Sequence, residues 1–182
     1  MILDDLRSML SSELNPILAN DGKHKLASIL VVIYGESPFV LMTEKPKHMK
    51  FHAGEISFPG GKLDSSDSNL LETALRETSE EIGLVIRKDQ VIGQLNPVIT
   101  LNSGFRILPF VTVLDKISEL APNAEVKKIF HIPLEPFLKT MKNDPDPNHN
   151  LIQEMYTFEF EGKIVWGASA RVLKQIVDCL KS

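Results

Sequence analysis

The sequence has little cysteine, no long apolar run and no excess of positive charge. Its single cysteine, Cys179, excludes a disulfide framework and a zinc site built from several cysteines, and it fits a reducing compartment. Twenty basic residues against 24 acidic ones give a formal charge of −4, which excludes a chain-wide basic surface for nucleic acid. No apolar run reaches the roughly 18 residues that span a bilayer, and the first residues, MILDDLRSML, carry acids where a signal peptide has basic charge. We therefore expect a cytoplasmic monomer or homodimer with no nucleic-acid and no membrane partner.

What the chain does contain is typical of one globular domain. It has 182 residues, 43% of them apolar, and no shift in composition marks a boundary within 1–182. Apolar and β-branched runs predict strands, and apolar positions at helical spacing predict helices. Strands are expected at 26–34, 39–43, 91–100, 106–114 and in a hairpin over 155–166, and helices at 2–19, 70–82, 133–141 and 168–180. This order predicts an α/β fold with a mixed central sheet.

The helix expected at 70–82 carries three carboxylates on one face. Glu77, Glu80 and Glu81 lie at i, i+3 and i+4, within an arc of roughly 100°. Like charges at this spacing cost a few tenths of a kcal/mol per pair, and the negative end of the helix dipole adds to that cost. Arg76 relieves only part of it. In an arbitrary helix such a pattern more often forms a solvated acidic face, but a divalent cation such as Mg²⁺ or Mn²⁺ would remove the cost, because these ions prefer oxygen ligands.

Two glycines precede this helix and change the interpretation. Gly60 and Gly61 end the run Phe-Pro-Gly-Gly, which alone is a simple tight turn or a place where the backbone approaches a ligand. After a spacer of 14 residues comes Arg-Glu-Thr-Ser-Glu-Glu-Ile-Gly-Leu at 76–84. Together the segments resemble the loop–helix–loop of the Nudix hydrolase family over about 60–84, with the pattern G-x5-E-x7-R-E-U-x-E-E-x-G-U, where U is bulky and apolar. Here the spacer is one residue longer, Asp67 or Ser68 stands at the first glutamate, and Thr78 fills an apolar position.

The resemblance implies a Nudix-type α/β/α sandwich and the hydrolysis of a nucleoside diphosphate linked to another group. The cofactor implied is Mg²⁺ or Mn²⁺. Glu80 and Glu81 match the family's principal metal-binding carboxylates, and Glu77 matches the glutamate that binds metal or aligns the attacking water. Arg76 matches the arginine that orients these carboxylates. Further candidates are the carbonyl of Gly60 as a metal ligand and Glu125 as a ligand or general base. For Glu125 it is equally open that the side chain has no part in the site.

The segment before the glycines narrows the substrate. Residues 41–61 resemble the additional motif of the coenzyme A diphosphatase subgroup, roughly LLTxRSxxxRxHxGxxxFPGG, and the longer spacer is also similar to that subgroup. The resemblance implies cleavage of coenzyme A or acyl-coenzyme A into 3′,5′-ADP and (acyl-)4′-phosphopantetheine. Lys45 and Lys50 stand where the motif has arginines, which keeps the charge but replaces a bidentate fork by a point charge. The matching positions are Leu41, Thr43, His52, Gly54, Phe58, Pro59, Gly60 and Gly61.

The basic side chains of the same segment are the expected substrate-binding groups. Between Thr43 and Lys62 there are four lysines and two histidines against two glutamates, next to a strongly acidic helix. The expected substrate-binding residues are Lys45, Lys50, His52, Gly61 and Lys62. Three alternatives stay open at this point: a solvated lysine-rich loop, another substrate (ADP-ribose, NADH, a dinucleoside polyphosphate or a damaged nucleotide), and a nucleotide-binding module without turnover.

Overall fold

The computed structural model describes residues 2–46, 54–149 and 154–181. Its strands are β1 (Lys25–Tyr34), β2 (Phe39–Glu44), β3 (Ile56–Ser57), β4 (Gly60–Lys62), β5 (Val91–Gln94), β6 (Val98–Ile99), β7 (Phe105–Leu114), β8 (Lys128–Pro133), β9 (Lys142–Asn143), β10 (Tyr156–Phe160) and β11 (Lys163–Val165). Its helices are α1 (Leu3–Leu10), α2 (Leu70–Ile82), the short 3₁₀ turn η1 (Lys88–Gln90), α3 (Leu134–Leu138) and α4 (Gly167–Cys179).

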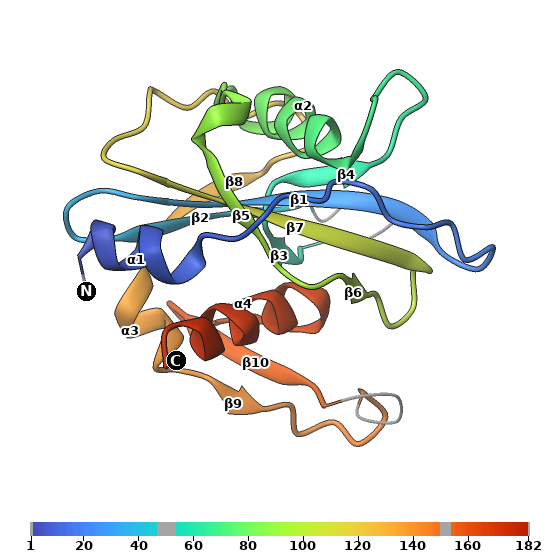
Figure 1. Cartoon of the computed structure of the whole chain (residues 1–182). Helices are drawn as coiled ribbons and strands as arrows, with labels where there is room; N and C mark the ends of the chain where they lie inside the picture. Colours follow the sequence, from blue (N-terminus) through green and yellow to red (C-terminus); the bar gives the residue numbers. More distant parts are fainter. Residues whose placement is uncertain (1, 47–53, 150–153, 182) are drawn as a thin grey trace.

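A mixed sheet lies at the centre of the molecule (Figure 1). Among the described residues it has eight strands, with β3-β2-β1-β7-β5 in order and with β4, β6 and β8 paired to β1, β7 and β2. β1 and β7 run parallel over their whole length, whereas the other pairs are antiparallel. The hairpin predicted over 155–166 forms β10 and β11, which belong to a smaller sheet with β9. The predicted mixed α/β fold is confirmed.

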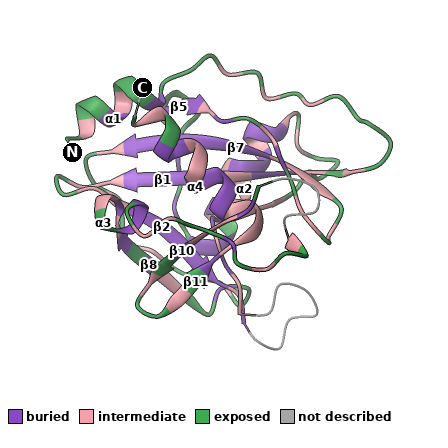
Figure 2. Cartoon of the chain, turned by 90° about the horizontal axis from the view of Figure 1, so that it is seen from below, coloured by how far each residue is buried: buried purple, intermediate pink, exposed green. Residues whose placement is uncertain are grey.

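Helices cover both faces of the sheet, and each face has its own apolar cluster (Figures 1 and 2). On one face α2 packs against β1, with Leu71, Ala74 and Ile82 in the cluster. On the other face α1 and α4 bury Leu6 and Leu173. Figure 2 shows the buried residues concentrated on the central strands and on the inner sides of these helices. The helix–sheet–helix arrangement is the expected sandwich.

The helix expected at 2–19 is wrong in its second half. α1 ends at Leu10, and the chain then runs beside β5, where the Ser12 amide donates to the carbonyl oxygen of Ile92 at 3.1 Å. The regularly spaced apolar residues that suggested one long helix do not share one helix face. They pack on two opposite faces of the sheet instead. The residues on the α4 side are Leu6 and Leu10, and those on the α2 side are Leu14 and Leu18.

The strand expected at 91–100 is interrupted by three residues between β5 and β6. Pro97 has no amide to donate to a ladder, and the side chain of Gln175 from α4 bonds both the amide and the carbonyl of Asn96, at 2.8 and 3.0 Å. The helix at 70–82 is confirmed at both ends, and the helix at 133–141 is shorter than expected, because α3 ends at Leu138. A single domain over 1–182 stays a prediction.

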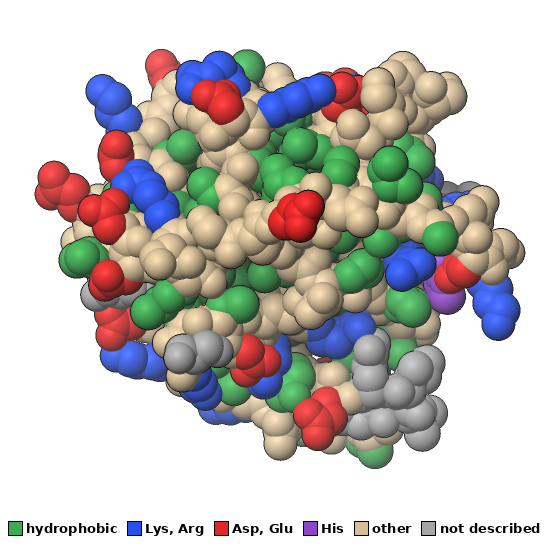
Figure 3. Space-filling view, in the orientation of Figure 1, with side chains coloured by type: hydrophobic (Ala, Val, Ile, Leu, Met, Phe, Trp, Pro, Cys, Tyr) green, Lys and Arg blue, Asp and Glu red, His purple; other side chains and the backbone are tan. Residues whose placement is uncertain are grey.

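The surface carries side chains of both charges, as the near balance of 20 basic and 24 acidic residues suggests. On the face drawn in Figure 3, acidic and basic side chains are interspersed rather than gathered into one broad patch of either sign. Of the helices in the described part of the chain, none combines the length and the apolar character that crossing a membrane requires.

Candidate active site

α2 carries the acidic residues on a well-capped helix. The Asn69 side chain accepts hydrogen bonds from two amides of the first turn, at 3.0 and 3.1 Å, and Gly83 ends the helix with a φ of 71°. Thr78 is fully buried, and its hydroxyl donates to a carbonyl one turn earlier at 2.7 Å. Thr78 therefore packs like the apolar residue it replaces, and the helix is fixed against the sheet.

The three glutamates of α2 occupy different environments. The side chain of Glu81 is 3% exposed, that of Glu77 is 19% exposed, and that of Glu80 is 56% exposed. Burial raises the pKa of the Glu81 carboxyl, and it also raises the pKa of Glu77. The acidic face predicted from the spacing is therefore not a uniform solvated surface, because two of its three carboxylates are covered by protein.

Gly60 and Gly61 lie on a strand, β4, that fits between β1 and these carboxylates. The Gly60 amide donates to Glu81 Oε2 at 3.1 Å. A Cβ on Gly60, where φ is 151°, would collide with the backbone of Ser28 and Ile29 on β1. A Cβ on Gly61 would collide with the Glu77 carboxylate. The glycine pair thus allows the backbone to approach two carboxylates closely, which a simple tight turn would not require.

Arg76 links the helix to the loop before it. Its guanidinium forms a bidentate pair with Asp67, at 2.8 and 2.9 Å, and also contacts Glu77 at 2.9 Å and Glu80 at 3.1 Å. The hydrogen bonds from Arg76 lower the pKa of Asp67 to about 2, and the same contact raises the pKa of Arg76. Asp67 is one of the two residues that stand at the first glutamate of the family pattern, so the sequence indicated its position but not its partner.

Of the cations in the described ranges, Lys45 lies nearest to Glu81. Its ammonium group, on a side chain 17% exposed, forms an ion pair with Glu81 Oε1 and lies 3.8 Å from Glu125 Oε2. The loop of Glu125 is held to α2, because the amides of Ala121 and Asn123 each donate to a carbonyl of the last turn at 2.9 Å. The structure therefore brings Glu125 to the site, and it pairs Lys45, expected at substrate phosphates, with a carboxylate.

The other expected substrate-binding residues are less closely gathered. Lys50 and His52 lie outside the described residues. Lys62 is exposed on β4, and its ammonium group lies over the ring of Phe105, 5.5 Å from the ring centre. Gly61 is the one member of this set besides Lys45 that the described structure places against an α2 glutamate.

The donor chemistry of the site fits Mg²⁺ or Mn²⁺, although the side chains are held apart. In the described ranges no three acidic or histidine side chains lie close enough together to hold a metal ion as they stand. The carboxylates of Glu77, Glu80 and Glu81 are hard oxygen donors, which these ions prefer. Two protein cations, Lys45 and Arg76, bind these oxygens in the present arrangement. The metal ligands therefore stay a prediction. In the present arrangement the Lys45 ammonium group lies between Glu81 and Glu125.

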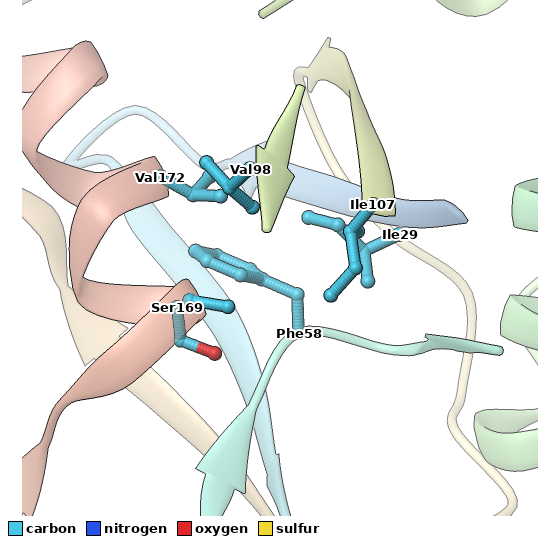
Figure 4. A pocket seen from close by; sticks show the side chains of 7 residues that line it. Ile29, Phe58, Val98, Ile107, Ser169 and Val172 are labelled. Atoms are coloured by element: carbon cyan, nitrogen blue, oxygen red, sulfur yellow. The ribbon is translucent and has the colours of Figure 1, made fainter. Parts of the chain in front are cut away.

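A small apolar cavity lies between the sheet and α4 (Figure 4). Its volume is about 20 Å³, which is room for about one water molecule. It is lined by Ile29, Phe58, Val98, Ile107, Ala168, Ser169 and Val172. Because it is far too small for a nucleotide base, it is not a substrate pocket as it stands.

Comparisons with known proteins give the family and agree with the fold. The family model of the NUDIX domain matches residues 24–155. A protein named uncharacterized Nudix hydrolase NudL, from Yersinia enterocolitica, is 32% identical over 164 residues, which is 86% of this chain and 82% of the relative. A MutT/nudix family protein from Enterococcus faecalis has a similar structure, with a TM-score of 0.59 at 15% identity over 89% of this chain and 65% of that one. The NUDIX domain of Shewanella oneidensis NrtR, solved with ADP ribose, gives a TM-score of 0.53 at 20% identity, over 70% of this chain and 82% of that one.

Proposed function

Because the chain belongs to the Nudix hydrolase family, which acts on nucleoside diphosphate derivatives, we propose that it is a metal-dependent diphosphatase of coenzyme A or acyl-coenzyme A. The products are 3′,5′-ADP and (acyl-)4′-phosphopantetheine. One observation carries the hydrolase part of the proposal. The backbone of Gly60 and Gly61 lies against the buried carboxylate of Glu81 and the largely covered carboxylate of Glu77, and within the described residues two cations, Lys45 and Arg76, balance them.

The metal would be held by Glu77, Glu80 and Glu81, with the Gly60 carbonyl as a further ligand. Bound there, Mg²⁺ or Mn²⁺ supplies positive charge that neutralises the diphosphate and lowers the pKa of a coordinated water. The protein's part is positioning. Arg76, anchored by Asp67, orients Glu77 and Glu80, and the Gly60 amide orients Glu81.

Two carboxylates are candidates for the general base. Glu77 can accept a proton only where it is not itself a metal ligand, and Gly61 keeps the backbone close beside its carboxylate. Glu125 lies on the other side of Lys45 and is 60% exposed, so it can move towards a bound substrate. A pH profile of kcat for Glu77→Gln and Glu125→Gln distinguishes them, because removal of the base abolishes the acidic limb of the profile.

The coenzyme A part of the proposal depends on the segment 41–61 and its basic residues. Coenzyme A differs from most dinucleotides by a 3′-phosphate, and a lysine-rich segment beside the metal-binding helix suits an additional phosphate. In the structure this segment starts on β2 and returns on β3, and the backbone pairing continues past the strands: Lys45 donates to Glu55 at 3.1 Å and accepts from Gly54 at 3.0 Å. Lys45 is therefore held at the site by its backbone.

The test is a substrate panel followed by phosphorus NMR. Purified protein with Mg²⁺ or Mn²⁺ is incubated with coenzyme A, dephospho-coenzyme A, ADP-ribose and NADH, and each reaction is repeated with EDTA. We expect cleavage of coenzyme A into 3′,5′-ADP and 4′-phosphopantetheine only with metal. Much faster cleavage of ADP-ribose would replace the substrate but keep the chemistry, and tight binding without any product would indicate a binding module.

ADP-ribose is the second candidate substrate, since the structurally similar NUDIX domain of NrtR was solved with ADP ribose. The two substrates differ in the 3′-phosphate, so a residue that recognises it separates them. We expect Lys50→Ala to weaken the binding of coenzyme A more than the binding of dephospho-coenzyme A. Equal losses for both would place Lys50 away from the 3′-phosphate.

A further inference from the structure

Lys45 has a role that its charge alone does not suggest. In the family motif an arginine stands at this position, and such a cation is expected to bind substrate phosphates. In the structure the ammonium group of Lys45 instead pairs with Glu81 Oε1 and lies 3.8 Å from Glu125 Oε2. The ammonium group lies between two carboxylates of the site, and its positive charge offsets their repulsion.

The charges explain why a cation lies there. Glu81 is the most deeply covered carboxylate of α2, and an uncompensated buried charge is strongly unfavourable. Arg76 contacts Glu77, Glu80 and Asp67, and within the described residues it makes no hydrogen bond to Glu81. Among the residues that the structure describes, Lys45 is therefore the side chain that balances the charge of Glu81.

The anchoring of Lys45 allows its side chain to change partner. Its backbone is fixed on both sides, by Glu55 and Gly54. The ammonium group is carried on a flexible four-carbon chain, and its second carboxylate neighbour among the described residues, Glu125, is 3.8 Å away and exposed. A divalent ion on Glu81 would repel the ammonium group. Because the backbone of Lys45 is fixed, the displaced ammonium group would stay close to Glu81 and Glu125.

We infer that Lys45 is an internal counter-ion: it holds Glu81 in the metal-free protein, gives up this carboxylate when a divalent ion binds, and then pairs with the diphosphate of the substrate. This inference rests on the proposed function, and it adds a coupling between metal binding and substrate binding. Metal binding frees the ammonium group for phosphate, so Lys45 lowers the affinity for metal alone and raises the affinity for substrate once metal is bound.

The experiment measures Mn²⁺ binding to the full chain by electron paramagnetic resonance, without substrate. Lys45→Met removes the competing cation, so we expect Mn²⁺ to bind at least about tenfold more tightly, because repulsion at roughly 4 Å is large even at an effective dielectric constant of about 20. Lys45→Arg keeps the charge and should stay near wild type. The matched control is Lys88→Met, which removes one positive charge next to α2 but breaks only the surface pair with Glu72.

The second measurement tests the exchange of partners. With saturating Mn²⁺, we expect Lys45→Met to bind methylenediphosphonate, an analogue that water does not cleave, at least about tenfold more weakly than wild type does. Should Lys45→Met fail to fold, lysine ammonium NMR on the wild-type chain replaces it. The protected Lys45 signal, assigned with Lys45→Arg, should then disappear on addition of Mg²⁺, and its persistence would overturn the inference.

The outcomes separate this inference from the proposed function. Unchanged or weaker Mn²⁺ binding by Lys45→Met overturns the counter-ion role even if the wild-type protein cleaves coenzyme A. Tighter Mn²⁺ binding together with weaker analogue binding supports the role even if coenzyme A stays intact, and in that case only the proposed substrate fails.

Discussion

Two neighbouring residues at the end of β2, Glu44 and Lys45, each belong to an ion pair with a buried carboxylate, one as the acid and the other as the base. Glu44 is a buried carboxylate, and Lys45 is the partner of another buried carboxylate, Glu81; the two acidic side chains are 4% and 3% exposed. Consecutive residues of a strand point to opposite faces of a sheet. Glu44 accordingly meets Lys163 of β11, and Lys45 meets Glu81 of α2.

The two carboxylates differ in how completely they are balanced. Glu44 contacts two ammonium groups, Lys127 at 2.8 Å and Lys163 at 3.2 Å, and the hydrogen bond from Lys127 lowers its pKa. Among the described residues Glu81 has one ammonium partner and one backbone amide, and burial raises its pKa. Removing an acid that is paired with two cations leaves those cations without their partner, whereas a buried acid with fewer partners is a candidate for binding a further cation.

The largest expected effect is on turnover, in Glu81→Gln. We expect kcat for diphosphate cleavage to fall by about a thousandfold or more, because a metal ligand contributes several kcal/mol of charge stabilisation in the transition state. The free energy of unfolding should change by less than about 1 kcal/mol, since the glutamine removes a charge that burial disfavours and the flexible Lys45 side chain, left without this partner, can turn to Glu125. Phosphorus NMR and urea unfolding measure the two quantities.

Glu72→Gln is the control for that experiment, since Glu72 lies on the same helix and its partners in the described part of the chain are surface groups, the Lys88 ammonium and the amide and hydroxyl of Ser68. Its activity should match that of wild type. An unfolded Glu81→Gln variant would mean that Glu81 is structural, as Glu44 is, and the contrast between the two carboxylates would fail.

The next effect is on stability, in Glu44→Gln. Breaking a buried pair with two lysines should cost about 2 kcal/mol of unfolding free energy at neutral pH, while Mn²⁺ affinity stays within about threefold of wild type. The folded-state pKa of Glu44 is lowered, so its contribution is present above its ordinary pKa and is lost as pH falls below it. Urea unfolding at pH 7 and pH 3 should therefore show a difference that shrinks in acid. A difference that stays constant would assign the cost to lost packing.

Asp67→Asn extends the comparison to a third buried carboxylate. The pKa of Asp67 is about 2 in the folded chain against an ordinary 3.8, which corresponds to about 2 kcal/mol. Because the folded pKa is the lower one, this stabilisation is complete above about pH 4 and disappears as pH falls towards 2. Unfolding curves across that range measure it. Loss of activity with unchanged stability would instead indicate that Asp67 acts only by orienting Arg76.

The smallest effect is expected for Gly61→Ala. The added methyl group meets the end of the flexible Glu77 side chain, so we expect kcat to fall about tenfold while the fold is kept. Gly60→Ala is the contrasting variant, because its methyl group would meet the β1 backbone and should destabilise the protein itself. Thermal unfolding and kcat for both variants distinguish a shifted carboxylate from a damaged sheet.

The prediction of the site from the sequence depended on α2. Its apolar stripe, its Asn69 and Gly83 ends and the spacing of its glutamates are local features, and helical geometry converts them directly into a face. The prediction failed for 2–19, because the period of the apolar residues does not say on which side of a sheet each one is buried. The bidentate pair between Asp67 and Arg76 also came from the structure, since the register of a loop against a helix is not a local property.

The sequence by itself determined the layered α/β fold, the acidic helix and the glycine pair, because these depend on short-range periodicity and on the backbone freedom of glycine. Only the tertiary structure decided which carboxylates are buried and which cation balances each of them. Lys45 and Glu81 are 36 residues apart, and Glu44 and Lys127 are 83 apart. Charges so distant along the chain meet only where strand pairing and helix packing place them, and this placement gives Glu44 two ammonium partners and, among the described residues, gives Glu81 one.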